Sequence, residues 1–175
     1  MLFGDNELLQ LEASLHYNGH VTLLQCCFRS NGKVIGHPGA SSALTAALPL
    51  FRQLLQSKGT RKVPFNLDYL TGDIINSLIS LNWDVNPSST VHCFNKDIAE
   101  RLEIRLQGLS SFEGFHLFLI EEGGAERFLW KDVQANKGYE IKLPKDYCYK
   151  TVNALLLAIQ EATYLAVKPG SALSQ

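Results

Sequence analysis

Hydrophobic and polar residues alternate along the first 36 residues in a pattern that predicts a three-stranded antiparallel meander. The alternation begins at the ninth residue, and the apolar positions of the first strand are Leu9, Leu11, Ala13, Leu15 and Tyr17. Successive side chains of a strand point to opposite faces, so these residues share one face. Asn18-Gly19 and Asn31-Gly32 are preferred pairs for two-residue turns that need positive φ. The two pairs therefore mark the ends of neighbouring strands.

The turns also predict a register. With Asn18 and Gly19 at the turn, the expected partners are Tyr17 with His20, Leu15 with Thr22, Ala13 with Leu24, Leu11 with Cys26 and Leu9 with Phe28. The second turn places Phe28 opposite Ile35 and Arg29 opposite Val34. The residues expected to be buried together are Tyr17, Leu24, Cys26, Phe28 and Ile35, and those expected on the opposite face are Gln10, Glu12 and Arg29. A slip of one residue would exchange the two faces, so the pattern constrains the pairing strongly.

Helical spacing follows the meander. The apolar stripe consists of Leu44, Leu48, Phe51 and Leu55, which repeat at intervals of three or four residues. Ser41 or Ser42 is expected to cap this helix, and Lys58-Gly59 to end it. Pro49 lies inside the stripe and predicts a kink or a break, because proline lacks a backbone N–H. A second helix is predicted over residues 72–81.

The second half of the chain returns to strand patterns. Strands are predicted at residues 90–94, 102–106, 115–120, 126–131 and 139–143. The segment 115–120 is apolar on both faces apart from His116, which is typical of a central strand. A last helix is expected to begin near Thr151 and to stop at Pro169.

This order of elements predicts an α+β fold with a mostly antiparallel sheet, built from the N-terminal meander and the C-terminal strands, and with helices packed on one side. The chain has 175 residues, which fits one domain with a sizeable core. We expect that domain to span residues 1–168 and residues 169–175 to form a flexible tail.

Composition excludes several classes of function. Sixteen basic and 17 acidic residues give a net charge of -1, so no basic surface for nucleic acid or anionic membrane is predicted. The opening residues lack the basic and apolar regions of a secretory signal, and no apolar run reaches the roughly 20 residues that span a bilayer. We therefore expect a cytoplasmic protein without a nucleic-acid or membrane partner.

The chemistry-bearing residues give no catalytic signature. The four cysteines are expected to be reduced, and Cys26 and Cys27 to point to opposite faces. Neither metal-ligand spacing nor a phosphate-binding glycine loop is present, so no metal or cofactor is predicted. Cys93 or Cys148 could serve as a nucleophile with a neighbouring base, but the flanking residues resemble no known nucleophile motif. A small cysteine-dependent hydrolase remains an alternative.

Several segments resemble the Immunity protein 42 family. They are Phe3-Gly4-Asp5, the run from Asn31 to Gly36, the strand from Phe115 to Glu121 with its continuation from Ala125 to Lys131, and the segment from Tyr139 to Lys145. The similarity covers about two-thirds of the chain and is weakest between residues 60 and 100. The resemblance implies a non-enzymatic immunity protein that binds and neutralises a cognate toxin domain. That toxin would belong to a contact-dependent inhibition system or be a type VI secretion effector. An adaptor or scaffold of a secretion system is the alternative within the class of binding proteins.

An immunity protein needs a complementary surface, and two loops are the candidates. One carries Trp83 and Asp84, because an exposed tryptophan is a frequent interface anchor. The other is an acidic hairpin with Glu121, Glu122 and Glu126, which would complement the basic cleft of a toxin that acts on nucleic acid. Loops at a sheet edge vary without disturbing the core. The alternatives are that Trp83 covers the edge of the core and that the glutamates form a solvated turn.

Overall fold

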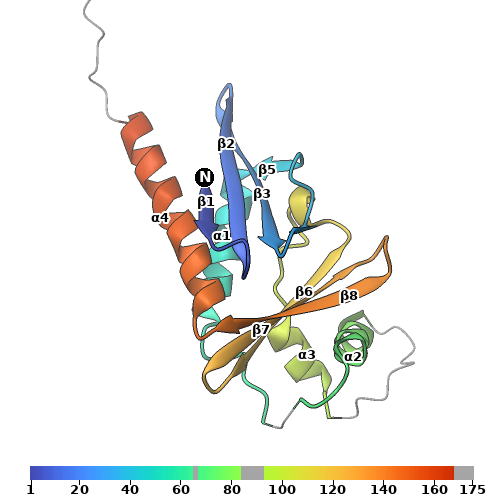
Figure 1. The fold of residues 1–175 in the computed structure, drawn as a ribbon. Coiled ribbons are helices and arrows are strands. Elements are labelled where there is room, and N and C mark those ends of the chain that lie inside the picture. Colours follow the sequence, from blue (N-terminus) through green and yellow to red (C-terminus); the bar gives the residue numbers. More distant parts are fainter. Residues whose placement is uncertain (65–66, 84–92, 168–175) are drawn as a thin grey trace, which may run out of the picture.

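Two antiparallel sheets organise the protein (Figure 1). The computed structural model describes residues 1–64, 67–83 and 93–167. The first sheet has the order β1-β2-β3-β4, and β5 also pairs with β3. Its strands are β1 (Leu2–Gly4), β2 (Gln10–Asn18), β3 (Val21–Ser30), β4 (Lys33–Ile35) and β5 (Ser41–Ala43). The second sheet has the order β6-β7-β8, with β6 (Phe115–Glu122), β7 (Ala125–Asp132) and β8 (Lys137–Pro144).

The helices pack on these sheets in two pairs. They are α1 (Leu44–Gln56), α2 (Thr71–Trp83), α3 (Lys96–Leu102) and α4 (Tyr147–Val167). Helices α1 and α4 cover the first sheet, whereas α2 and α3 lie against the second (Figure 1). The predicted α+β class with antiparallel pairing is confirmed. No helix in the described ranges is both long and apolar enough to cross a membrane.

The second sheet is buried on both faces. Leu117 and Phe128 face a large core shared with the first sheet, α1 and α4, whereas Phe118 and Ile120 face a smaller core shared with α2 and α3. This explains why the sequence of β6 is apolar on both faces. The expectation of a central strand is wrong, because β7 is central and β6 lies at the edge.

The β2–β3 hairpin has the predicted faces in a different register. Asn18 pairs with Val21, and the further pairs are Tyr17 with Thr22, Leu15 with Leu24, Ala13 with Cys26 and Leu11 with Phe28. The turn residues are Gly19 and His20, and Gly19 has a φ of 61°. A glycine at the first turn position is the type II′ arrangement, which does not require Asn18 to adopt positive φ. The shift of two residues keeps every side chain on its predicted face.

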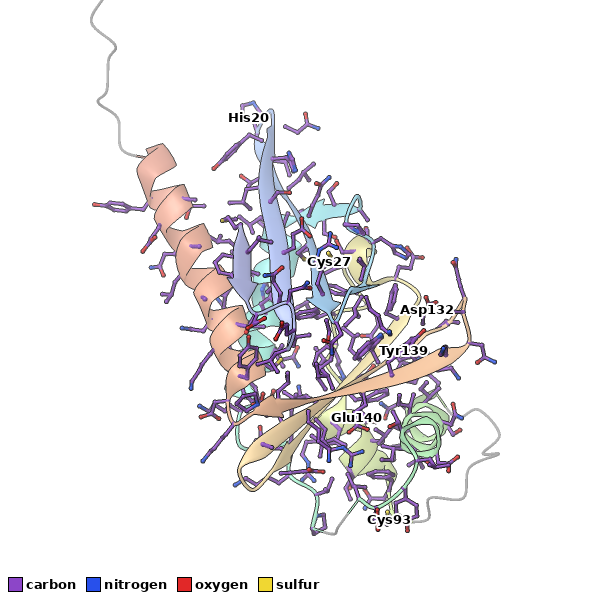
Figure 2. The ribbon with its side chains drawn as sticks, in the orientation of Figure 1. His20, Cys27, Cys93, Asp132, Tyr139 and Glu140 are labelled. Carbon is purple, nitrogen blue, oxygen red and sulfur yellow. The ribbon has the colours of Figure 1, made fainter. Side chains whose placement is uncertain are left out.

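Burial follows the faces except at the tip of this hairpin. Leu24, Cys26, Phe28 and Ile35 are buried as predicted. Tyr17 is 62% exposed, because the tip of β2 and β3 extends beyond the core, as the position of His20 shows (Figure 2). The second turn behaves as predicted: Asn31 and Gly32 both have positive φ, and Phe28 pairs with Ile35.

The type II′ turn gives a direct test of this register. We expect Gly19→Val to lower the free energy of unfolding by about 1–2 kcal/mol, because a β-branched residue resists positive φ. His20→Val is the matched control, since no positive φ is found at His20. Urea denaturation measures both variants. Equal losses in the two variants would contradict the assignment of Gly19 to the strained position.

Several helix and strand boundaries differ from the predictions. Ser41 and Ser42 lie in β5 rather than capping α1, and Ala43 is the N-cap residue. The helix continues past Pro49 without a break, although proline cannot donate a hydrogen bond to the carbonyl of the residue four positions earlier. Residues 102–106 do not form a strand: α3 ends at Leu102, and only Glu103 makes an isolated bridge to Phe118.

Two other expectations fall mainly on residues that the structure does not describe. The short strand predicted at residues 90–94 is described only at Cys93 and Phe94, which are not in a strand. The predicted tail at residues 169–175 lies outside the described residues.

Candidate interaction surface

The acidic hairpin joins β6 to β7, and its three glutamates face different surroundings. Glu121 and Glu126 are paired across the two strands, whereas Glu122 lies on the other face. Glu126 is only 1% exposed. The three carboxylates therefore do not form one acidic surface.

Glu126 lies at the N-terminus of α4. Its Oε2 accepts a hydrogen bond from the Cys148 N–H at 2.8 Å, and its Oε1 has no hydrogen-bond partner in the described part of the protein. A carboxylate at this end of a helix satisfies a free N–H and complements the helix dipole. This explains why α4 begins at Tyr147 rather than near Thr151. Thr151, the expected first residue of the helix, lies inside it, and its hydroxyl donates to the carbonyl of Tyr147.

Burial also gives Glu126 a pH-dependent role. Desolvation raises the pKa of its carboxyl above the ordinary 4.5, although the Cys148 N–H opposes this. The folded state then holds the proton more tightly than the unfolded chain, so the contribution to stability is full below pH 4.5 and is lost as the pH rises through the folded pKa. We expect the stability of the wild type relative to Glu126→Gln to fall over that interval. Urea denaturation between pH 4 and pH 8 measures it.

The control for this prediction is Glu113→Gln, which removes a charge from an exposed side chain. The pH-dependent loss of wild-type stability should be larger when measured against Glu126→Gln than against Glu113→Gln. A difference between wild type and Glu126→Gln that is independent of pH would show that Glu126 titrates alike in the folded and unfolded chains.

The other two glutamates of the hairpin also have intramolecular partners. Glu121 Oε1 accepts hydrogen bonds from the Tyr149 hydroxyl at 2.5 Å and from the Gly59 N–H at 2.8 Å. Glu122 lies 3.3 Å from Arg127 Nη1, and its side chain remains 37% exposed. Glu121 thus connects the hairpin to α4 and to the segment after α1, while Glu122 keeps an accessible carboxylate.

Trp83 is the last residue of α2 and lies at the other end of β6. Its ring packs on His116 with centroids 4.3 Å apart, in an edge-on arrangement, and Trp83 remains 41% exposed. His116 and Glu121 are five residues apart on the strand, or roughly 17 Å. The structure therefore does not bring Trp83 and the acidic hairpin together, and Asp84 lies outside the described residues.

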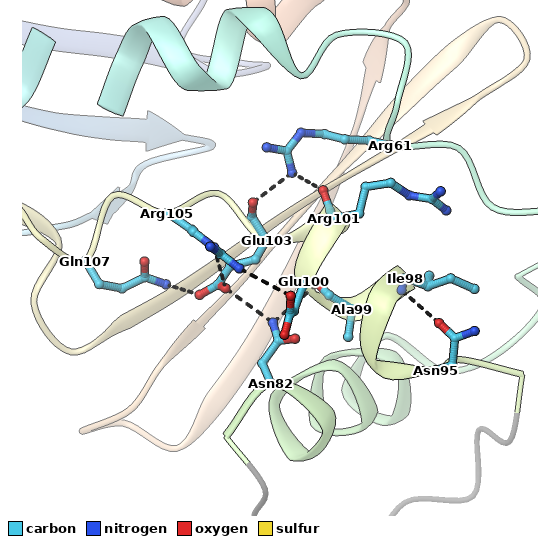
Figure 3. Close-up of polar contacts among 10 residues, drawn as sticks. All are labelled: Arg61, Asn82, Asn95, Ile98, Ala99, Glu100, Arg101, Glu103, Arg105 and Gln107. Carbon is cyan, nitrogen blue, oxygen red and sulfur yellow. Dashed lines mark hydrogen bonds and ion pairs between the residues drawn. The ribbon is translucent and has the colours of Figure 1, made fainter. Parts of the chain in front are cut away.

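A polar network connects the end of α2 to α3 and to the segment that follows it (Figure 3). Glu103 is its centre and is only 8% exposed. Its Oε1 accepts from Gln107 at 2.9 Å, and its Oε2 lies 3.5 Å from Arg105 Nε and accepts from Asn82 at 3.4 Å. Burial raises the pKa of Glu103, and the nearby Arg105 guanidinium opposes that rise. Asn82 directly precedes Trp83 in α2, so this network holds the end of the helix that carries the indole.

A cleft of about 380 Å³ opens between α1 and α3, and Glu103 and Arg105 of the polar network line it. Its walls come from the C-terminal half of α1, the segment after it, α3 and the residues that follow α3, including Arg61, Arg101 and Glu103. Arg61 is only 4% exposed. Sequence reasoning missed this group: Arg61 belongs to a short basic run that predicts a solvated loop, and Glu103 and Arg105 follow a strand-like alternation.

Three of the four cysteines, Cys26, Cys27 and Cys148, are buried. Cys148 is fully buried, and desolvation raises the pKa of its thiol well above the ordinary value. Burial likewise raises the pKa of Cys26 to about 12. Cys93 is half-buried near the start of α3, far from Cys27 (Figure 2). Within the described ranges, no group of three histidine, cysteine or acidic residues is arranged to hold a metal ion.

Comparisons with known proteins agree with this fold. The crystal structure of CdiI from Burkholderia dolosa is similar to the structure of this chain with a TM-score of 0.68 and 16% sequence identity, covering 90% of this chain and 99% of that chain. At that identity the likeness is one of fold. No curated protein matches the chain. The family model described as Immunity protein 42 matches residues 1–157, and because this is most of the 175 residues, the chain belongs to the Immunity protein 42 family.

Proposed function

We propose that the protein binds a cognate toxin domain made by the same cell or its kin and neutralises it without catalysis. The observation that carries this proposal is the family match over residues 1–157. The fold shared with CdiI over 90% of the chain supports it. We further propose that the protein acts in the cytoplasm, against a toxin delivered there by contact-dependent inhibition or a related system.

Burial disfavours Cys148, one of the two cysteines considered as the nucleophile of a hydrolase, whereas Cys93 is half-buried. A catalytic cysteine must reach its substrate and must form a thiolate. Cys148 is inaccessible, and its pKa is raised by burial. Neutralisation by binding needs only a rigid scaffold with a complementary surface, and the two cores provide that scaffold.

The toxin-binding surface is proposed to include Trp83. Trp and Arg are the residue types most enriched among interface residues that dominate binding, and Trp83 is a half-exposed indole next to a network that contains Arg105. Of the hairpin glutamates, Glu122 retains an accessible carboxylate for a partner. Glu121 and Glu126 contribute to the scaffold through their intramolecular hydrogen bonds.

Co-expression with the product of the adjacent upstream gene tests the function. We expect this protein to rescue growth from that product and to form a complex with it in size-exclusion chromatography. Trp83→Ala should weaken the complex by about 2 kcal/mol or more, which is roughly 30-fold in Kd. Tyr17→Ala, which truncates another exposed aromatic residue at the far tip of β2, should leave Kd within a factor of two.

The outcomes separate function from surface. Absence of both rescue and complex would remove the immunity function. Rescue with an unchanged Kd for Trp83→Ala would retain the function and exclude Trp83 from the contact.

A further inference from the structure

The cleft between α1 and α3 contains a buried cation that is not neutralised by an ion pair. Arg61 Nη1 donates to the carbonyl oxygens of Arg101 and Glu103, both at 2.8 Å (Figure 3). Its Nε donates to Ser57 Oγ at 3.0 Å. No carboxylate of the described residues lies within 4 Å of this guanidinium. Glu121 is nearby, but its Oε1 already accepts from Tyr149 and Gly59.

Arg101 adds a second guanidinium group to the cleft. It is exposed, and its Nη2 donates to the carbonyl oxygen of Lys62 at 2.9 Å. The carboxylates of the cleft do not neutralise these two cations. Glu103 is bonded to Arg105, Gln107 and Asn82, and Glu100 lies 3.8 Å from Arg105. Asp97 is exposed on α3.

The carbonyl and hydroxyl oxygens that accept from Arg61 carry no net charge, so they leave its positive charge uncompensated. A carboxylate would accept its N–H groups and also neutralise that charge. Nε and Nη1 of Arg61 already donate to these acceptors, so a carboxylate in the cleft would bond Arg61 through Nη2. Arg61 is positioned by its three acceptors before any partner arrives, so little side-chain freedom is lost on binding.

We propose that this cleft receives an aspartate or glutamate side chain from a protruding segment of the toxin. Arg61 and Arg101 would donate hydrogen bonds to its carboxylate. The inference rests on the proposed function. A volume of about 380 Å³ is near the lower end of the range for ligand pockets, which suits one inserted side chain and its neighbours. The exposed carboxylates of Asp97 and Glu100 disfavour a free multivalent anion, whereas a polypeptide can present basic or amide groups to them.

The position of the cleft supports the same partner. Glu103 contributes to the cleft wall and, through Asn82, to the network that adjoins Trp83. The hydrogen bond from Asn82 to Glu103 thus holds the C-terminal end of α2 beside the wall of the cleft, and we place both in the area that one toxin domain covers.

Isothermal titration calorimetry with the purified upstream-gene product tests the inference. Arg101→Gln is the main variant, because Arg101 is exposed and glutamine retains helix propensity. We expect its Kd to rise at least tenfold and to depend less on salt than that of the wild type. Arg52→Gln is the control: Arg52 is an exposed arginine of α1 that lines a different groove, against α4, and its Kd should stay within a factor of two.

Hydrogen–deuterium exchange gives a second measurement that needs no substitution at Arg61. In the complex, residues 57–61 and 97–105 should exchange more slowly than in the free protein. Failure of the wild type to form any complex would remove the proposed function itself. A complex that forms with unchanged exchange in these segments, or with wild-type affinity for Arg101→Gln, would overturn the inference and leave the proposed function intact.

Discussion

Replacing Arg127 with methionine is expected to lower the free energy of unfolding by about 3–5 kcal/mol, the usual loss when one partner of a buried ion pair is removed. Arg127 is 6% exposed, and its Nε and Nη2 each donate to a Glu140 oxygen at 2.8 Å. Nη1 donates to the carbonyl of Leu67 at 3.1 Å. Methionine retains an apolar stem but leaves the mostly buried Glu140 without its cation.

The same pair predicts a pH dependence. Burial raises the pKa of Glu140, but hydrogen bonds from Arg127 and Thr71 outweigh burial, so the pKa is lowered from 4.5. The stabilisation is therefore present above pH 4.5 and is lost as the pH falls through the lowered pKa of the folded state. The cost of Arg127→Met should shrink over that acidic interval.

Arg29→Met is the matched control, because Arg29 pairs with Glu12 at side-chain exposures of 35% and 40%. Exposed pairs contribute about 0–1 kcal/mol, so this variant should lose far less stability. Chemical denaturation measures the free energy of unfolding of both single variants and of the double variant Arg127→Met/Glu140→Gln. Equal losses in the two single variants would show that burial of the Arg127 pair adds nothing to its contribution.

Phe28→Ala is expected to cost about 3–5 kcal/mol, as large-to-small substitutions of buried aromatic residues do. Phe28 is fully buried on β3, and its ring centroid lies 5.5 Å from that of Phe112 and 5.4 Å from that of Phe128 on β7. This side chain therefore connects the two sheets. Its removal leaves a cavity between elements that cannot all collapse into it.

Two comparisons make this prediction specific. Phe28→Leu should cost less than alanine, because more of the volume remains. Val34→Ala changes a residue of the neighbouring strand that is 38% exposed and should change stability by about 0.5 kcal/mol or less. Thermal or urea denaturation measures all three. A small loss for Phe28→Ala would contradict the description of one large core shared by both sheets.

The scaffold and the proposed binding surface use charge in different ways. Glu126 and Arg127 are adjacent in β7 and face opposite cores, where each is held by groups from other elements. Arg61 is also buried, but it lines an open cleft, and the acceptors of its hydrogen bonds among the described residues are neutral. This difference is the reason for assigning the first two residues to stability and the third to recognition.

Local pattern was sufficient for much of the architecture. Alternation assigned the faces of β2 and β3 correctly even though the predicted register was wrong. A register shift of two residues leaves every side chain on the same face, because the side-chain period of a strand is two. Asn31-Gly32 gave the second turn, since both residues adopt positive φ as a type I′ turn requires. Helical spacing located α1 and α2, because their apolar stripes are formed by residues within each helix.

The sequence by itself thus determined the strand faces, the main elements and the family resemblance. Only the tertiary structure decided where α4 begins, because the group at its N-terminus is the Glu126 carboxylate, 22 residues from Cys148 in the chain. It likewise decided that Glu121 and Glu126 of the acidic hairpin have hydrogen-bond partners within the protein and that Arg61 and Glu103 meet at one cleft. Local spacing could not reveal these features, because each depends on partners that are distant in the sequence.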